Sequence, residues 1–118
     1  MFRVRNDGES NYDRIKRDVL AIVRDIPAGK VTTYAAIGAA LDVMPRHVAY
    51  LLAMLTDLEQ DDLPWYRVVG LAGKLSTTNP IRAGKQRAFL EAEGISFRGK
   101  WQIDAFDLVF FPIAPAAE

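Results

Sequence analysis

Two aromatic side chains and an arginine stand side by side in the segment Pro64-Trp65-Tyr66-Arg67-Val68-Val69. Flat rings suit stacking and apolar contact. The Arg67 guanidinium carries a planar fork of donors that can tie a strand to a core. Taken alone, the segment fits an aromatic-rich core strand as well as it fits a binding site, so the rest of the chain must decide between the two.

Nucleophilic and metal chemistry have little support in the sequence. The chain has no cysteine, which excludes disulfides, thiolate zinc sites and a thiolate nucleophile. His47 is the only histidine, and a lone histidine is rarely catalytic without a partner. We see no metal-ligand cluster or phosphate loop and predict no metal and no cofactor. An enzyme that uses Tyr66 and Glu93 for proton chemistry, such as a glycosylase, stays open as an alternative.

Length and composition fit one domain. The chain has 118 residues, half of them hydrophobic and a quarter charged. Residues 1–10 are predicted to form a flexible N-terminal arm, and residues 11–118 a single domain. The start does not look like a signal peptide, and no apolar run approaches the ~20 residues of a membrane helix. The sequence therefore predicts a cytoplasmic protein with no membrane partner.

A pair of helices is predicted ahead of the aromatic segment. Apolar residues at helical spacing first predict a helix that is capped by Ser10 or Asn11 and ends at residues 27–29. Thr33 suits the N-cap of a second helix over residues 34–41. A third helix begins at Pro45, whose missing N–H is no loss at that position. Two helices joined by so short a turn predict a helix-turn-helix.

The remaining elements are predicted to be a small β unit, one helix and a packed tail. Residues 65–69 read as a buried strand, and residues 74–76 as its return strand, which together make a small wing. Asn79 and Pro80 predict the start of a helix that runs from Ile81 to Glu93. The tail is too apolar to be disordered and is predicted to pack on the domain. The predicted fold is mainly α with a small β hairpin, winged helix-turn-helix-like.

The third predicted helix has an apolar side and a polar side. Its predicted buried stripe consists of Val48, Leu51, Leu52, Leu55 and Leu58. Arg46, Tyr50, Ala53 and Asp57 then face outward. Arg46 lies at the helix start, where free N–H groups and the helix dipole favour phosphate. Net charge is zero, so a DNA-binding role requires the charges to be segregated, with an acidic loop over residues 57–62 and basic residues after it.

The aromatic segment resembles the Pro-Cys-His-Arg-Val signature of O6-alkylguanine-DNA alkyltransferases, with Trp65 in the cysteine position and Tyr66 in the histidine position. Three more matches follow the family order. They are Val31-Thr32-Thr33-Tyr34, Arg46-His47-Val48-Ala49-Tyr50 and Leu90-Glu91-Ala92-Glu93-Gly94. The resemblance implies the C-terminal domain of that family, a helix-turn-helix in the minor groove, and a flipped nucleotide replaced by an arginine.

The resemblance assigns the DNA contacts to the helix-turn-helix. Tyr34 matches the tyrosine that swings the nucleotide out, and Arg46 matches the inserting arginine. Tyr50 departs from the small residues of the family pattern. The residues predicted to contact DNA are Thr33, Tyr34, Arg46, His47, Ala49 and Tyr50.

The resemblance also implies a base pocket, with main-chain groups of the aromatic segment reading the guanine edge. Residues 76–79 replace the Gly-Tyr-Ser-Gly-type loop of the family, and residues 59–63 replace its Asn-Pro hinge. Glu93 matches the family glutamate but has no thiol to activate, which favours a structural role. The residues predicted to line the alkylguanine pocket are Pro64, Trp65, Tyr66, Val68, Ser76 and Thr78.

The sequence therefore predicts an alkyltransferase-like, non-enzymatic protein. It binds double-stranded DNA that contains O6-alkylguanine, flips the base and holds it without alkyl transfer. The resemblance further implies that the complex flags the lesion for nucleotide excision repair proteins. A winged-helix regulator or interaction module without lesion specificity, in which the aromatic segment is core, is the second alternative.

Overall fold

The computed structural model describes residues 10–115. The predicted flexible arm, residues 1–10, therefore lies outside the described residues apart from Ser10. Ser10 has a definite role, because its side-chain oxygen accepts a hydrogen bond from the Asp13 N–H at 3.0 Å. It is the N-cap of helix α1, Asn11–Asp25. The sequence had offered both Ser10 and Asn11 for this position, and the structure selects the former.

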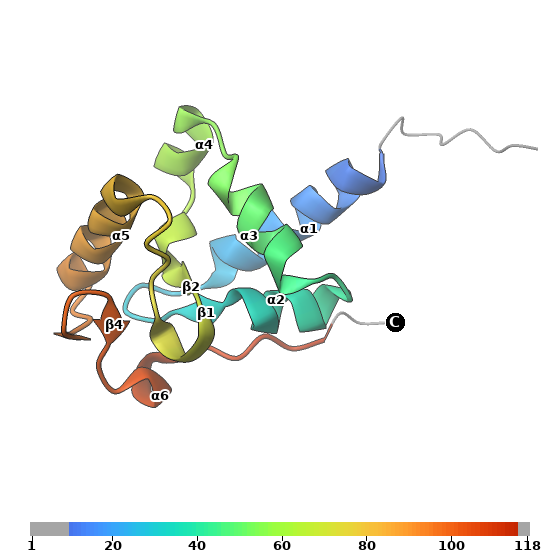
Figure 1. The fold of residues 1–118 in the computed structure, drawn as a ribbon. Coiled ribbons are helices and arrows are strands. Elements are labelled where there is room, and N and C mark those ends of the chain that lie inside the picture. Colours follow the sequence, from blue (N-terminus) through green and yellow to red (C-terminus); the bar gives the residue numbers. More distant parts are fainter. Residues whose placement is uncertain (1–9, 116–118) are drawn as a thin grey trace, which may run out of the picture.

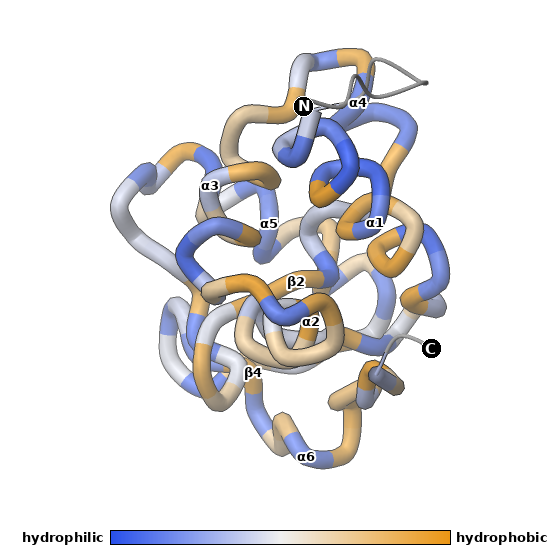
Figure 2. The backbone as a smooth tube through the Cα atoms, turned by 90° about the vertical axis from the view of Figure 1, so that its right-hand side faces the viewer, coloured by the Kyte–Doolittle hydropathy of each residue, from blue (hydrophilic) through white to orange (hydrophobic). Residues whose placement is uncertain are grey.

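Helix α1 is amphipathic. Its inward residues Val19 and Val23 are fully buried, and polar residues alternate with them around the helix, as the blue and orange segments of Figure 2 show. The predicted extent of this helix is confirmed. Within the described residues, no helix is long and apolar enough to cross a membrane.

The predicted helix-turn-helix is confirmed. Strand β1, Thr32–Thr33, leads into α2, Tyr34–Leu41, and α3 follows over Pro45–Ala53. Asp42 ends α2 in the left-handed conformation with a φ of 59°. Gly38 lets the two helices approach closely, since a Cβ there would lie 2.4 Å from the Val43 carbonyl oxygen.

The predicted acidic loop is wrong, because residues Asp57–Asp62 form a short helix, α4. A capping box starts it: Thr56 Oγ1 accepts from the Glu59 N–H, and Glu59 Oε1 accepts from the Thr56 N–H. The break between α3 and α4 also overturns the predicted end of the buried stripe. Leu58 belongs to the new helix and is 80% exposed.

The predicted strand over residues 65–69 is half wrong. Trp65–Arg67 form a turn of 3₁₀ helix, η1, and only Val68–Val69 form a strand, β2. The local bonds explain the difference, since the Arg67 N–H donates to the Pro64 carbonyl and the segment satisfies its own backbone.

The predicted wing is also wrong. Strand β2 pairs in parallel with β1, with Thr32 opposite Val68. Leu71–Gly73 form a second 3₁₀ turn, η2, and residues 74–76 do not return along β2. A hairpin does exist further on, where β3, Phe97–Arg98, pairs antiparallel with β4, Gln102–Ile103.

Helix α5, Pro80–Ala92, begins and ends as predicted to within one residue. Asn79 Oδ1 caps it by accepting from the Arg82 N–H at 3.1 Å. After β4 the chain forms the short helix α6, Phe106–Val109, and then runs back past α2 toward the C-terminal end (Figure 1). Val31 bridges to Phe110 on this return path. The prediction that the apolar tail packs on the domain is confirmed.

The core has two clusters of buried side chains. The first joins α1, α2, α3 and the start of the aromatic segment, and it includes Trp65. The second lies between β1, β2, α5 and the β3–β4 hairpin. The aromatic segment thus lies where the two clusters meet.

Candidate DNA interface and base pocket

One face of α5 clamps the aromatic segment. Arg82, Gln86, Phe89 and Glu93 are spaced by four, three and four residues, which places them on one side of the helix. Each of the four contacts the segment over residues 65–68, as the next paragraphs describe. The segment over residues 65–68 is therefore held by side chains on one side of a single helix.

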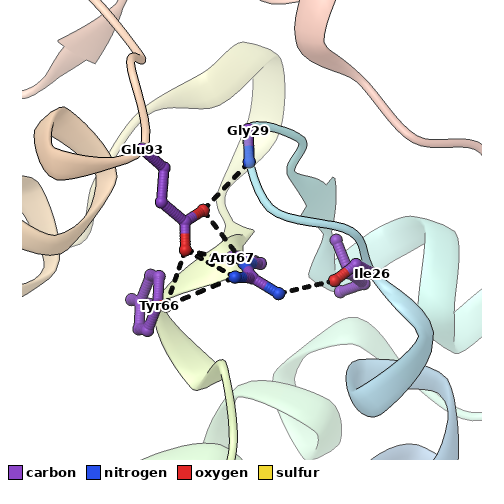
Figure 3. A network of polar contacts seen from close by, with 5 residues as sticks. All are labelled: Ile26, Gly29, Tyr66, Arg67 and Glu93. Carbon is purple, nitrogen blue, oxygen red and sulfur yellow. Dashed lines mark hydrogen bonds and ion pairs between the residues drawn. The ribbon is translucent and has the colours of Figure 1, made fainter.

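Glu93, the last of these four residues, is the centre of a polar network (Figure 3). Tyr66 Oη donates to Glu93 Oε2 at 2.7 Å, and Arg67 Nε donates to Glu93 Oε1 at 3.0 Å. Arg67 Nη1 donates to the Ile26 carbonyl at 2.7 Å, which ties the segment to the end of α1. The Gly29 N–H also donates to Glu93 Oε1. The sequence interpretation of Arg67 and Glu93 as structural residues agrees with these contacts.

The network keeps Glu93 ionised. Burial by itself would raise the pKa of Glu93, but hydrogen bonds from Arg67, Tyr66 and the Gly29 N–H outweigh burial and hold the pKa below its ordinary value. Burial, followed by the hydrogen bond to the Glu93 carboxylate, raises the pKa of Tyr66. Tyr66 therefore stays a neutral donor at physiological pH, which does not suit it to act as a base.

Gln86 engages the backbone of the segment. Its Nε2 donates to the Tyr66 carbonyl at 3.1 Å and to the Val68 carbonyl at 2.9 Å. These carbonyls are among the main-chain groups that the sequence predicted to read a guanine edge. Val68 is fully buried, so a base that uses its carbonyl must share it with Gln86.

Trp65 is enclosed by other side chains and is only 3% exposed. The Arg82 guanidinium lies over its ring, 4.2 Å from the centroid. Phe89 and Tyr66 meet the indole edge-on, with centroids 6.4 and 6.0 Å away. Tyr66 and Phe89 in turn stack on each other at 4.8 Å.

Two hollows open on either side of Trp65. A cavity of 280 Å³ lies between the end of α3, α4 and the start of α5, and we call it the base cavity. It is lined by Ala53, Gln60, Trp65, Asn79, Ile81, Arg82 and Lys85. A second hollow of 420 Å³ lies toward α4 and is lined in part by Pro64, Trp65, Tyr66 and Phe89.

The structure separates the residues predicted to form one pocket. Trp65 lines both hollows, while Pro64 and Tyr66 line only the second. Ser76 and Thr78 are exposed in the loop before α5, where the Thr78 N–H approaches Ser76 Oγ at 3.4 Å. Asn79, next in sequence, does line the base cavity.

The predicted DNA contacts of α3 lie on its outer side. Arg46 is exposed in the first turn, and no hydrogen bond or ion pair engages it within residues 10–115. Tyr50 is 58% exposed, and Ala49 is half-buried. His47 and Tyr50 border a largely apolar groove of 330 Å³ against α1.

The two predicted contacts at the start of α2 are engaged within the protein. Thr33 is buried, and its Oγ1 caps α2 by accepting from the Ala36 N–H at 3.0 Å. Tyr34 is half-buried. Burial raises the pKa of its phenol, while the positive charge of Arg82 acts in the opposite direction. Tyr34 and Arg82, far apart in sequence, thus lie near each other.

Basic residues of α1 partly neutralise the acidic helix. Lys16 Nζ lies 3.0 Å from Glu59 Oε2, and Arg24 lies 3.5 Å from Asp62. These contacts leave the acidic charge of α4 less exposed to an approaching phosphate backbone than the sequence indicated. The acidic charge is therefore less separated from basic charge than the sequence predicted for a DNA-binding role.

Arg82, Gln86 and Gln60 are site residues that sequence reasoning missed. A weak signal for Arg82 was present, because a cation in the first turn of a helix is opposed by the helix dipole unless it has a specific partner. The spacing of Arg82, Gln86, Phe89 and Glu93 is a second signal. It was hidden because the stripe is mostly polar, whereas buried helix faces are recognised by apolar residues.

Comparison with known proteins identifies the family of this chain. Residues 14–95 match the family described as "6-O-methylguanine DNA methyltransferase, DNA binding domain". The chain belongs to this alkyltransferase family. It is an alkyltransferase-like member, with Trp65 where the family signature has its cysteine and no cysteine elsewhere.

Two relatives of this alkyltransferase-like chain are each named "DNA base-flipping protein". The one from Escherichia coli K12 is 41% identical over 93 residues, which is 78% of this chain and 70% of the relative. The one from Vibrio parahaemolyticus is 38% identical over 85 residues, which is 70% of this chain and 82% of the relative.

Two solved structures share the fold. S. pombe Atl1 in complex with damaged DNA containing O6-carboxymethylguanine superposes with a TM-score of 0.76 at 24% identity, over 86% of this chain and 97% of Atl1. S. pombe ATL in complex with DNA gives a TM-score of 0.72 at 27% identity with the same coverage. The alkyltransferase-like fold is therefore complete in the described residues.

Proposed function

We propose that the protein recognises O6-alkylguanine in duplex DNA. It inserts α3 in the minor groove, flips the damaged nucleotide and holds the base beside Trp65. The observation that carries this proposal is the pairing of an exposed Arg46 at the start of α3, whose side chain has no partner within residues 10–115, with a cavity at the end of the same helix. The names of the bacterial relatives and the DNA-bound S. pombe structures support it.

The held base is not repaired. Alkyl transfer in this family needs a thiolate as acceptor, and the chain has no cysteine. The indole that replaces it is buried under Arg82 and Phe89. Tyr66, in the position of the activating histidine, is a neutral hydrogen-bond donor to Glu93. The protein therefore binds and does not catalyse.

A complex that lasts without repair serves as a signal. We propose that it is passed to nucleotide excision repair proteins, a step that rests on the resemblance and not on any contact in the structure. The cytoplasmic location of the protein likewise stays a prediction.

Selective affinity is the first test. Binding to a duplex with a single O6-methylguanine is expected to be tighter than binding to the matched undamaged duplex, because a mispaired base costs less to unstack. Fluorescence anisotropy at one stated salt concentration measures both affinities. Equal affinities would favour the winged-helix regulator, which binds DNA without lesion specificity.

Arg46→Ala tests insertion. The variant is expected to weaken binding of the lesion duplex by about 1–3 kcal/mol, because it removes a charged, hydrogen-bonding group from the groove. A 2-aminopurine reporter beside the lesion should also lose its flipping signal. Arg24→Ala, on α1, removes the same charge away from α3 and is the control. A loss no larger than that of Arg24→Ala would contradict insertion.

A further inference from the structure

Arg82 connects three parts of the site that are far apart in sequence. Its guanidinium lies 4.2 Å from the centroid of the Trp65 ring, and its Nη2 donates to the Leu52 carbonyl at 3.2 Å. Its positive charge also acts on the phenol of Tyr34. One side chain from the first turn of α5 thus contacts the aromatic segment and the last turn of α3, and it lies near the first turn of α2.

These contacts place Arg82 where a flipped base has to go. It lines the base cavity together with Trp65, and its guanidinium covers the indole face that a flat base would use for stacking. Trp65 is 3% exposed, with Arg82 over its ring and Tyr66 and Phe89 at its edges. A base cannot stack on this face while Arg82 lies there.

We infer that Arg82 is a gate that controls the access of a flipped base to the base cavity. In the DNA-free protein it closes the base cavity over Trp65, and a flipped base enters only by displacing it. This inference rests on the proposed function and deepens it, because it names the residue that a flipped base has to displace.

The effect of the gate depends on what each base must already overcome. A normal base pair resists extrusion more than a pair weakened by alkylation. The gate adds the same opening cost to both, namely the cation–π contact with Trp65 and the hydrogen bond to Leu52. An equal cost leaves the difference in affinity between the two bases unchanged, but it lowers the flipped fraction of each. With the gate present, the flipped fraction of an undamaged base stays below detection, and without the gate that fraction rises.

The closed gate is tested first without DNA. The chain has two tryptophans, Trp65 and Trp101, so acrylamide quenching in a Trp101→Phe background reports on Trp65 alone. Arg82→Ala is expected to raise the quenching constant at least threefold. Arg98→Ala, which removes an equal charge outside the base cavity, should leave it unchanged. Unchanged quenching in Arg82→Ala, with an intact circular dichroism spectrum, would overturn the gate.

The effect of the gate on binding and flipping is tested on matched duplexes. Relative to wild type, Arg82→Ala is expected to bind the O6-methylguanine duplex roughly threefold to tenfold more tightly, the range that a partly desolvated cation–π contact represents. It should also give a 2-aminopurine flipping signal on the undamaged duplex. Arg98→Ala removes an equal charge from β3, outside the base cavity, and is the control. Arg82→Lys keeps the charge but lacks the planar guanidinium, so its affinity for the lesion duplex should lie between those of the wild type and Arg82→Ala.

The outcomes separate the gate from the proposed function. Weaker lesion binding by Arg82→Ala, relative to Arg98→Ala, would overturn the gate and make Arg82 a direct contact of the base. If the wild type does not prefer the lesion duplex, the proposed function fails. The acrylamide experiment then still decides whether Arg82 closes the cavity over Trp65, because it needs no DNA.

Discussion

Glu93→Gln is expected to lower the free energy of unfolding by about 3 kcal/mol at pH 7, the lower end of the cost of breaking a buried ion pair. The side chains of Arg67 and Glu93 are only 15% and 13% exposed. Without the carboxylate, the Arg67 guanidinium stays largely buried without a counter-charge, and the Tyr66 hydroxyl loses its acceptor. Urea denaturation followed by circular dichroism measures the change.

The same variant should show a distinctive pH dependence. The pKa of Glu93 in the folded protein lies below its ordinary value, so the stabilisation is present above the unfolded pKa of about 4.3. It is lost as the pH falls through the lower, folded pKa. The gap in stability between wild type and Glu93→Gln is therefore expected to be full at pH 7 and to close below about pH 4.

Glu91→Gln is the matched control. Glu91 pairs with Arg87 on the same helix at 3.1 Å, but its side chain is 48% exposed. An exposed pair of this kind is worth only about 0.5 kcal/mol. Equal losses from the two substitutions would show that the network around Glu93 is no more than a surface ion pair.

Trp65→Cys puts a thiol in the family position, yet it is expected to transfer no detectable alkyl group. A thiol near its reference pKa of about 8.5 is mostly protonated at neutral pH, and Tyr66 cannot activate it. The substitution should also lower the free energy of unfolding by about 3–5 kcal/mol, because a large buried side chain leaves a cavity. Transfer of labelled methyl from DNA and denaturation measure the two effects.

Adding Tyr66→His is expected to give more transfer than either single change. Position 66 already faces Glu93 at hydrogen-bond distance, so an imidazole there has a carboxylate to orient it. A double variant that binds the lesion duplex and stays inert would assign the difference to the loop around Ser76 and Asn79. Labelled methyl on the wild-type protein would contradict the non-enzymatic function itself.

The helices were predictable because their signals are local. Ser10, Thr33 and Asn79 cap helices through contacts three residues away, and Pro45 and Pro80 mark helix starts. Such contacts depend on neighbouring residues only. The boundaries of α1, α2 and α5 could therefore be derived from the sequence.

The β elements and the site assembly depend on contacts between distant segments. Strand β2 was predicted to pair with residues 74–76, but its partner is β1, on the far side of the helix-turn-helix. The wrong choice of partner follows from the preference for short hairpin connections. The spacing of Arg82 and Gln86 on one side of α5 is visible in the sequence, but their partners Trp65, Tyr66 and Val68 lie in a distant segment, so these contacts could not be predicted.

The parallel pair of β1 and β2 also has a consequence for the order of folding. The loop that it closes contains α2, α3 and α4. The entropy cost of closing so long a loop comes before the contacts between β1 and β2 can compensate for it. A nascent chain that has emerged as far as α4 already has the helix-turn-helix that we propose to enter the groove, but it lacks Trp65 and the α5 stripe. The proposed base capture is therefore expected only once the last third of the chain has been synthesised and docked, so an unfinished chain is expected not to sequester a lesion.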